Sequence, residues 1–312
     1  MGEDALVVSA PAKVNLTLEV LGRRPDAYHE VRSVVQAISL ADRLTLATAD
    51  SLSLHCDRAD LEGPDNLAWR AAALLREATG YARGAAIRLV KRVPVAAGLG
   101  GGSSDAAAAL RGLNRLWRVA LPDERLRALG ARLGADVPFF LGAGTCALAA
   151  GRGERLTPLP PLPRRWLVLL KPPFGLATAS VFRAFPPERW SDGSRTLEWV
   201  RRVQAGSDVP PPFNDLEAVA LDLAPAAVQA HDALLAAGAP LAHMSGSGPT
   251  FFALFGQVAD ARRVYRRLRA QGGEAYLARF TSEMARLRRA PSPPGAAAAD
   301  GERRPGGEAQ WV

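Results

Sequence analysis

The sequence predicts an α+β fold in two lobes. Apolar and polar residues alternate from Val14 to Val20, which is the period of a half-buried strand. Apolar residues recur at helical spacing from Leu67 to Ala78 and from Ala107 to Trp117. A proline-rich stretch, Pro158 to Pro163, separates this half from a second mixture of strands and helices. A chain of 312 residues is long enough for two such lobes.

The first half is expected to open on the strand that carries Lys13 and Asn15. The alternation places these two side chains on one face, opposite the apolar side. Short strands are predicted at residues 44–46, 52–54 and 87–90, with the first helix between the last two.

The second half should begin with a buried strand, Trp166–Leu170, because its residues are continuously apolar. We predict a flexible excursion between Pro186 and Pro212. From about Ala290 the chain is proline, glycine, alanine and charge, with little to bury. We therefore predict domains at residues 1–160 and 161–288 and a disordered tail at 289–312.

Composition narrows the classes of protein that the chain can be. It is 48% hydrophobic and 22% charged, which is typical of a globular protein, and it has no apolar run near the roughly 20 residues that span a bilayer. No signal peptide is recognised, and the two cysteines lack metal-ligand spacing. We expect a cytoplasmic protein without a membrane partner, either a monomer or a homodimer.

The net charge of +8 raises the question of a nucleic-acid partner. The arginines are dispersed, and the densest cluster, within residues 262–269, alternates with apolar residues at helical spacing. That pattern is typical of the solvent face of an amphipathic helix, so we expect no nucleic-acid partner.

The strongest single motif is the glycine-rich segment Gly98–Ser104, Gly-Leu-Gly-Gly-Gly-Ser-Ser. Glycines let a backbone approach a ligand closely, and a following helix N-terminus favours phosphate. The two serines and Asp105 are candidate caps for that helix. The alternative is a flexible linker, but a linker would not usually lie between a strand and an alanine-rich helix.

Three further segments are ordinary when taken alone. Asp136 lies near a helix start beside Pro138 and could be a simple N-cap. The segment Met244–Thr250, Met-Ser-Gly-Ser-Gly-Pro-Thr, reads as a tight turn. Lys13 opens a strand.

Taken together and in this order, the four segments resemble the GHMP kinases, the superfamily of galactokinase, homoserine kinase and mevalonate kinase. The resemblance extends from about residue 9 to residue 256. The segments at 10–16, 26–30, 98–105, 134–140 and 244–249 are similar to the members that phosphorylate the 2-hydroxyl of a diphosphocytidyl methylerythritol in the non-mevalonate isoprenoid pathway. Those members usually have glycine where this chain has Ala27.

The resemblance implies a two-lobed kinase that uses ATP and Mg²⁺. The first lobe would resemble ribosomal protein S5 domain 2, and the second an α/β plait. Asp136 would accept the proton of the substrate hydroxyl, while Lys13 would keep Asp136 ionised and offset charge on the transferred phosphoryl group. Ser103 or Ser104 would be a ligand of Mg²⁺.

The resemblance also implies binding residues. The expected ATP-binding residues are Asn66, Pro94, Val95, Ala96, Ala97, Gly98, Leu99, Gly100, Gly101, Gly102, Ser103 and Ser104. The expected residues for a small-molecule cytidine diphosphate substrate are Asn15, Tyr28, His29, Phe182, Gly246, Ser247 and Gly248. Tyr28 and Phe182 would stack on the two faces of the cytosine, and His29 would hydrogen-bond to it. Asn66 could equally cap the next helix, and Phe182 could equally be a core residue.

Two alternatives compete with this interpretation. One is a GHMP kinase of the homoserine or mevalonate type, for which a cytosine pocket would have no use. The other is a catalytically silent nucleotide- or RNA-binding protein on the same fold. The presence of both Lys13 and Asp136 opposes the second alternative, as does a surface poor in aromatic residues.

Overall fold

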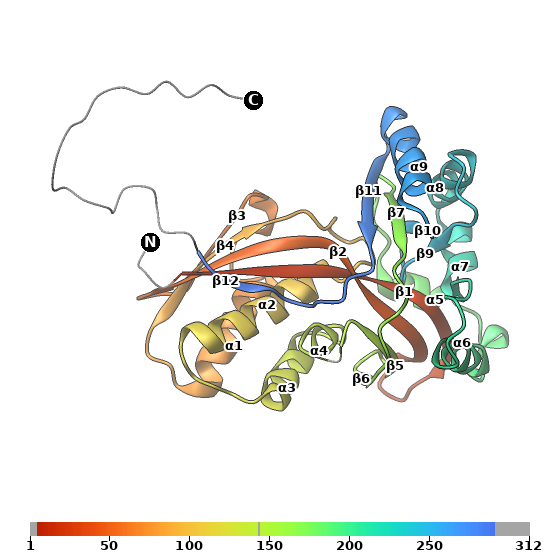
Figure 1. Ribbon diagram of the computed structural model, residues 1–312. Coiled ribbons are helices and arrows are strands. Elements are labelled where there is room, and N and C mark those ends of the chain that lie inside the picture. Colours follow the sequence, from red (N-terminus) through yellow and green to blue (C-terminus); the bar gives the residue numbers. More distant parts are fainter. Residues whose placement is uncertain (1–4, 143, 291–312) are drawn as a thin grey trace, which may run out of the picture.

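Two β-sheets, each covered by helices, make up the protein (Figure 1). The computed structural model describes residues 5–142 and 144–290. The first sheet has the strand order β12-β1-β2-β4-β3, with β5 and β8 paired to β2 and β1 and β6 paired to β5. The second has the order β11-β7-β10-β9. This architecture confirms the predicted α+β class.

The strands are β1 Leu6–Arg23, β2 His29–Ala49, β3 Ser53–Cys56, β4 Gly84–Val90, β5 Cys146–Gly151, β6 Arg155–Pro158, β7 Trp166–Lys171, β8 Phe213–Asn214, β9 His243–Met244, β10 Phe251–Phe255, β11 Glu274–Arg279 and β12 Leu287–Arg289. The helices are α1 Leu67–Thr79, α2 Gly101–Leu116, α3 Asp123–Leu133, α4 Val137–Phe140, α5 Thr178–Ala184, α6 Ser194–Gln204, α7 Leu216–Leu223, α8 Pro225–Ala236 and α9 Val258–Ala270, with short 3₁₀ turns at Ala59–Leu61 and Pro187–Arg189.

The antiparallel pair β1–β2 connects the two halves of the molecule. Its ladder begins at Leu6↔Leu46 and ends at Arg23↔His29, beside the turn that carries Tyr28. At the first end, Val8 packs with Leu110 of α2, and at the other end Val20 packs with Val168 of the second sheet. One strand therefore contributes to both cores, and Figure 1 shows β1 running from beside α1 and α2 toward β7.

The segment Pro186–Pro212 was predicted to be flexible, but it is folded and packs against β1. Helix α6 lies within it, and Trp199 is buried in the core. Glu19 of β1 is fully buried and accepts hydrogen bonds from the backbone N–H of Thr196 at 2.7 Å and from Ser191 Oγ at 2.9 Å. The prediction of flexibility is wrong because this segment is held against β1 by hydrogen bonds to Glu19, a residue more than 170 positions away in the sequence.

The end of the described chain returns to the first sheet. After β11, strand β12 pairs with β1 in the register Leu6↔Arg289. The predicted tail began at residue 289, but Arg289 belongs to this strand, and residues 291–312 lie outside the described residues. The boundary predicted at residues 160 and 161 stays a prediction.

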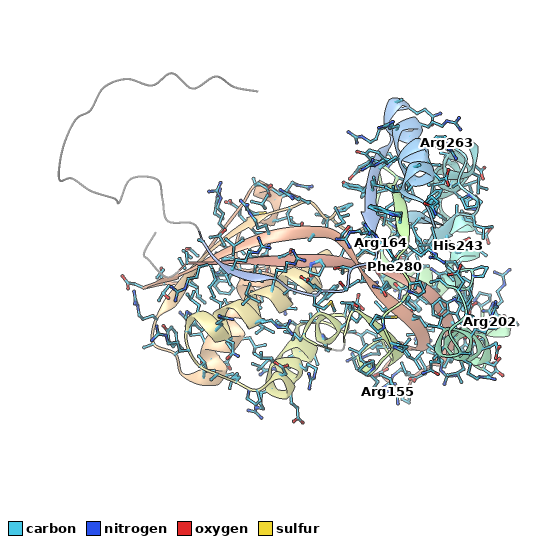
Figure 2. The ribbon with its side chains drawn as sticks, viewed as in Figure 1. Arg155, Arg164, Arg202, His243, Arg263 and Phe280 are labelled. Carbon is cyan, nitrogen blue, oxygen red and sulfur yellow. The ribbon has the colours of Figure 1, made fainter. Side chains whose placement is uncertain are left out.

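The basic side chains are distributed over several elements. Figure 2 labels Arg155 at β6, Arg202 on α6 and Arg263 on α9, which lie far apart on the ribbon. As predicted, α9 buries Val264 and Leu268 and leaves Arg263 exposed. Within the described ranges, no helix has the length and apolar character needed to span a bilayer.

Candidate active site

Lys13 and Asp136 meet although they come from different parts of the chain. Lys13 lies on β1, and its Nζ is 3.6 Å from Oδ2 of Asp136. The lysine side chain is 6% exposed and the aspartate side chain 43% exposed. Asp136 occupies the N-cap position of α4 but makes no capping hydrogen bond. Its carboxylate therefore does not serve as a helix cap, and it is exposed both to Lys13 and to solvent.

A buried polar chain fixes Lys13. Its Nζ donates to Asn15 Oδ1 at 2.7 Å, and Asn15 Nδ2 donates to Ser33 Oγ at 2.7 Å. The backbone N–H of Lys13 donates to the carbonyl of Leu99 at 2.9 Å, which ties β1 to the glycine-rich loop. Buried polar groups that are satisfied in this way hold one geometry.

The glycine-rich loop ends at the N-terminus of α2. Gly100 is the N-cap residue, with φ of +69°, and the helix has no side-chain cap. The predicted capping by the serines and Asp105 is therefore wrong. Because no side chain caps it, the first N–H groups of the helix stay available to an anion, which the positive end of the helix dipole also favours.

Asp105 has a different partner. Its Oδ2 accepts from Lys91 Nζ at 2.7 Å, and Lys91 also pairs with Asp42 at 2.5 Å. Burial, together with the nearby Asp42, raises the pKa of Asp105 to about 7, against the opposing charge of Lys91. The cluster links β2, the residue that follows β4 and the N-terminal part of α2.

The second glycine loop, residues 244–250, packs directly on the first. Gly98 has φ of +73°, and a Cβ there would lie 2.3 Å from the carbonyl oxygen of Ser245. Ser245 Oγ donates to the Gly98 carbonyl at 3.1 Å, and Asn214 Nδ2 donates to the carbonyls of Met244 and Gly246 at 2.8 and 2.7 Å. Glycine is required at position 98 because the two backbones touch.

The aromatic residues lie at the other end of the site. The rings of His29 and Phe182 are stacked, with centroids 5.2 Å apart and an interplanar angle of 27°. Tyr28 is 56% exposed, and the guanidinium of Arg152 lies 4.7 Å from its ring centroid. Burial and the positive charge of Arg23 lower the pKa of His29 below its ordinary value, which favours the neutral ring.

One cavity of about 1010 Å³ brings most of the predicted residues together. Its lining includes the predicted residues Lys13, Asn15, Tyr28, His29, Gly98, Gly100, Ser103, Asp136, Phe182, Gly246 and Ser247. The predicted residues Asn66, Pro94–Ala97, Leu99, Gly101, Gly102, Ser104 and Gly248 are not part of this lining.

Asn66 and Ser104 illustrate the second group. Asn66 caps α1, since its Oδ1 accepts from the backbone N–H of Ala68 and its Nδ2 donates to the carbonyl of Leu61. Ser104 is buried, and its hydroxyl has no hydrogen-bond partner among the residues described. Ser103 is thus the serine that faces the cavity.

The sequence reasoning missed several residues that line the cavity. They are Arg23, Arg152, Thr178, Arg183 and Trp190. Thr178 Oγ1 lies 2.8 Å from Ser247 Oγ, which links α5 to the second glycine loop. The one local signal was the pair of glycines that flank Arg152, because it marks a tight turn.

Two family models match the chain. The model of the GHMP kinases N terminal domain matches residues 66–144, and the model of the GHMP kinases C terminal region matches residues 197–274. The first match contains the glycine-rich loop and Asp136. The second match contains the second glycine loop.

Full-length relatives give the same result. The chain is 48% identical over 266 residues to a 4-diphosphocytidyl-2-C-methyl-D-erythritol kinase of Pelotomaculum thermopropionicum, covering 83% of this chain and 92% of the relative. It is 44% identical to the enzyme of that name from Moorella thermoacetica, covering 88% and 99%.

Solved structures share the fold. A crystal structure of 4-(cytidine 5'-diphospho)-2C-methyl-D-erythritol kinase superposes with a TM-score of 0.77 at 41% identity, covering 89% of this chain and all of that one. A homoserine kinase from Cytophaga hutchinsonii superposes with a TM-score of 0.68 at 19% identity, covering 92% of this chain and 98% of that one, and so shares the fold alone.

Proposed function

The chain belongs to the 4-diphosphocytidyl-2-C-methyl-D-erythritol kinases of the GHMP kinase family, and we propose that it performs their reaction with Lys13 and Asp136 at its centre. It is a phosphotransferase that uses ATP and an alcohol acceptor. The acceptor is the 2-hydroxyl of 4-diphosphocytidyl-2-C-methyl-D-erythritol, and the product is an intermediate of the non-mevalonate isoprenoid pathway.

The observation that carries the assignment of roles is the Lys13–Asp136 pair in the same cavity as the glycine-rich loop. A carboxylate that is half exposed and free of capping can reach a substrate hydroxyl. The cation beside it is buried and held by Asn15, so it contributes a fixed positive charge where negative charge develops.

The proposed reaction is an in-line phosphoryl transfer. Asp136 takes the proton of the 2-hydroxyl as that oxygen attacks the γ-phosphorus of ATP. The bond from the γ-phosphorus to the β–γ bridging oxygen breaks, and ADP leaves with that electron pair. Lys13 offsets the charge of the transferred group, and the free N–H groups at the start of α2 hold the phosphates.

We propose that Mg²⁺ enters this site together with ATP, whose phosphates would supply most of its ligands. Within residues 5–142 and 144–290 no group of three or more His, Cys, Asp or Glu side chains could hold a metal by itself. Ser103 faces the cavity from the first turn of α2 and is the protein ligand we propose. Ser103 would hold Mg²⁺ together with the ATP phosphates, and the ion would neutralise part of their negative charge.

The base-binding end of the cavity supports the particular substrate. We propose that cytosine binds beside Tyr28, His29 and Phe182. The free His29–Phe182 stack has a centroid separation of 5.2 Å, too small for a base between these two rings. The base would therefore lie against Tyr28 and against the face of Phe182 that points away from His29, and neutral His29 would hydrogen-bond to its edge.

A coupled assay tests the proposal. Purified protein with Mg²⁺ and ATP should release ADP when given 4-diphosphocytidyl-2-C-methyl-D-erythritol, and release should stay at background with homoserine or mevalonate. Phosphorus NMR of the product should show a new phosphomonoester. ADP release with homoserine or mevalonate, and none with the cytidyl substrate, would contradict the assignment.

A further inference from the structure

Arg152 lies in the turn between β5 and β6, which borders both ends of the active-site cavity. The guanidinium of Arg152 lies over Tyr28 at 4.7 Å. On the other side, a Cβ at the next residue, Gly153, would lie 3.8 Å from Oδ1 of Asp136. This turn therefore spans the distance from the proposed cytosine site to the carboxylate that receives the proton.

One hydrogen bond to β2 and one within the turn hold the turn in place. The backbone N–H of Gly151 donates to Glu30 Oε1 at 3.1 Å, and that of Arg152 donates to Glu154 Oε2 at 2.6 Å. Gly151 and Gly153 have φ of +76° and +112°. Because glycine accepts such angles without strain, the tight turn keeps the start of the Arg152 side chain in one place.

We propose that Arg152 binds the diphosphate of the substrate while its guanidinium stays stacked on Tyr28. The inference rests on the proposed function, which supplies a substrate with cytosine at one end, the reacting hydroxyl at the other and a diphosphate between them. Arg152 lies over Tyr28 at the cytosine end, and the next residue, Gly153, lies beside Asp136 at the end of the reacting hydroxyl.

The geometry of the guanidinium permits both contacts at once. Stacking on an aromatic ring uses the flat face of the group, and its five N–H donors point outward in the plane. Those donors can bind two phosphate oxygens in a bidentate manner, which a lysine ammonium cannot do. The other two arginines of the lining belong to the base end, since Arg23 pairs with His29 in the β1–β2 ladder and Arg183 follows Phe182 on α5.

Ligands that differ only in phosphate content test the inference. Binding of cytidine, CMP and CDP is measured by calorimetry at fixed ionic strength, with a saturating non-hydrolysable ATP analogue present so that the donor site is filled. Arg152→Ala should weaken CDP binding by about 10- to 100-fold and cytidine binding by no more than about threefold, because the lost hydrogen bonds are charge-assisted. Arg152→Lys should recover part of the affinity for CDP.

Arg155 provides the matched control. It lies three residues further along the same hairpin (Figure 2). Its side chain pairs with Glu30 and is not part of the cavity lining. Arg155→Ala should leave all three affinities within about threefold of the parent. In steady-state kinetics, Arg152→Ala should raise KM for the cytidyl substrate and leave KM for ATP unchanged.

The outcomes separate the two proposals. Equal losses for cytidine and CDP would mean that Arg152 only supports Tyr28, and that result would overturn the diphosphate contact. Unchanged affinities in Arg152→Ala would overturn it as well. Failure of the proposed function looks different, because the parent protein itself would then bind none of the three ligands and would not turn over the cytidyl substrate.

Discussion

Lys13 Nζ and Asp136 Oδ2 lie 3.6 Å apart, with the lysine buried and the aspartate open to the cavity. The asymmetry matters because charge stabilisation requires a fixed cation, whereas proton transfer requires an accessible base. Asn15 Oδ1 accepts a hydrogen bond from the buried Lys13 ammonium, and Asp136 is the member of the pair that is exposed to solvent. The distance and the difference in exposure support the proposed roles of Lys13 as the fixed cation and Asp136 as the base.

Asp136→Asn should lower kcat by roughly 10² to 10⁴, which is the usual contribution of a positioned acid or base, with ATP binding retained. Single-turnover phosphoryl transfer and calorimetric binding of an ATP analogue measure the two quantities. Asp260→Asn, at an exposed i,i+3 pair on α9, is the control and should change neither. A kcat within threefold of the parent would remove Asp136 from the role of base.

Lys13→Met should also lower kcat by about 10² or more, because the developing charge loses its partner. A stability loss of about 1–3 kcal/mol should accompany it, since Asn15 Oδ1 then lacks its buried donor. Thermal unfolding and kcat are measured on the same preparations. Lys171→Met, at a pair with Glu274 in the second sheet, should leave kcat intact. Normal turnover in Lys13→Met would contradict the proposed role.

His29→Ala should raise KM for the cytidyl substrate far more than KM for ATP, because buried polar groups of the base lose their partner. Tyr28→Ala should act similarly through lost stacking, worth about 1–3 kcal/mol, and Tyr28→Phe should be mild. The truncated substrate 2-C-methyl-D-erythritol 4-phosphate should be a poor acceptor. Efficient turnover of that compound would mean that there is no cytosine site here.

The pH dependence of that KM follows from the His29 ring. Burial and the charge of Arg23 lower its pKa below the ordinary 6.5, so the ring is neutral at pH 7.5. KM for the cytidyl substrate should stay flat above pH 6.5 and rise as the pH falls below it, when the ring gains a proton and loses its acceptor nitrogen. His29→Gln should remove the rise, and a rise that persists in this variant would assign it to another group.

Gly98→Ala should destabilise the protein by about 1–3 kcal/mol, because φ is +73° and the new Cβ would press on the Ser245 carbonyl 2.3 Å away. Both KM values should rise, since the two glycine loops separate. Chemical denaturation and steady-state kinetics report the two effects. Gly256→Ala, where no heavy atom lies within 4 Å of the new Cβ, should be close to neutral.

Ala27→Gly should stabilise the protein, by up to about 1 kcal/mol, because Ala27 has φ of +65° in the turn before Tyr28. The greater freedom of glycine in the unfolded chain offsets part of the gain. The midpoint of urea unfolding measures it. Ala233→Gly, inside α8, should have the opposite sign, and a destabilised Ala27→Gly variant would show that the turn conformation carries no strain.

Local patterns predicted much of the fold. The alternation around Val14 found β1, and the spacing from Leu67 and from Ala107 found α1 and α2. Similar reasoning failed at Pro186–Pro212, where prolines and charges suggested flexibility but α6 folds over β1. Its burial depends on partners such as Glu19, which lie far away in the sequence.

Some residues of the candidate site could also be predicted from local patterns, and others could not. Lys13, Asp136 and Tyr28 could be proposed because each belongs to a motif with a recognisable order. Arg152 could not, because the flanking glycines indicate a tight turn but not that the turn borders the site. Its position above Tyr28 arises from the pairing of β5 with β2, which no local pattern reports.

The sequence by itself determined the local conformations, the glycine positions where a backbone must approach another group, and the set of chemical groups available to a kinase. Only the tertiary structure decided that Ser103 faces the cavity while Ser104 is buried, that Asn66 caps α1, and that Glu19 is covered. The physical reason is that periodicity and turn chemistry act between near neighbours, whereas burial and the meeting of side chains depend on how distant strands and helices pack.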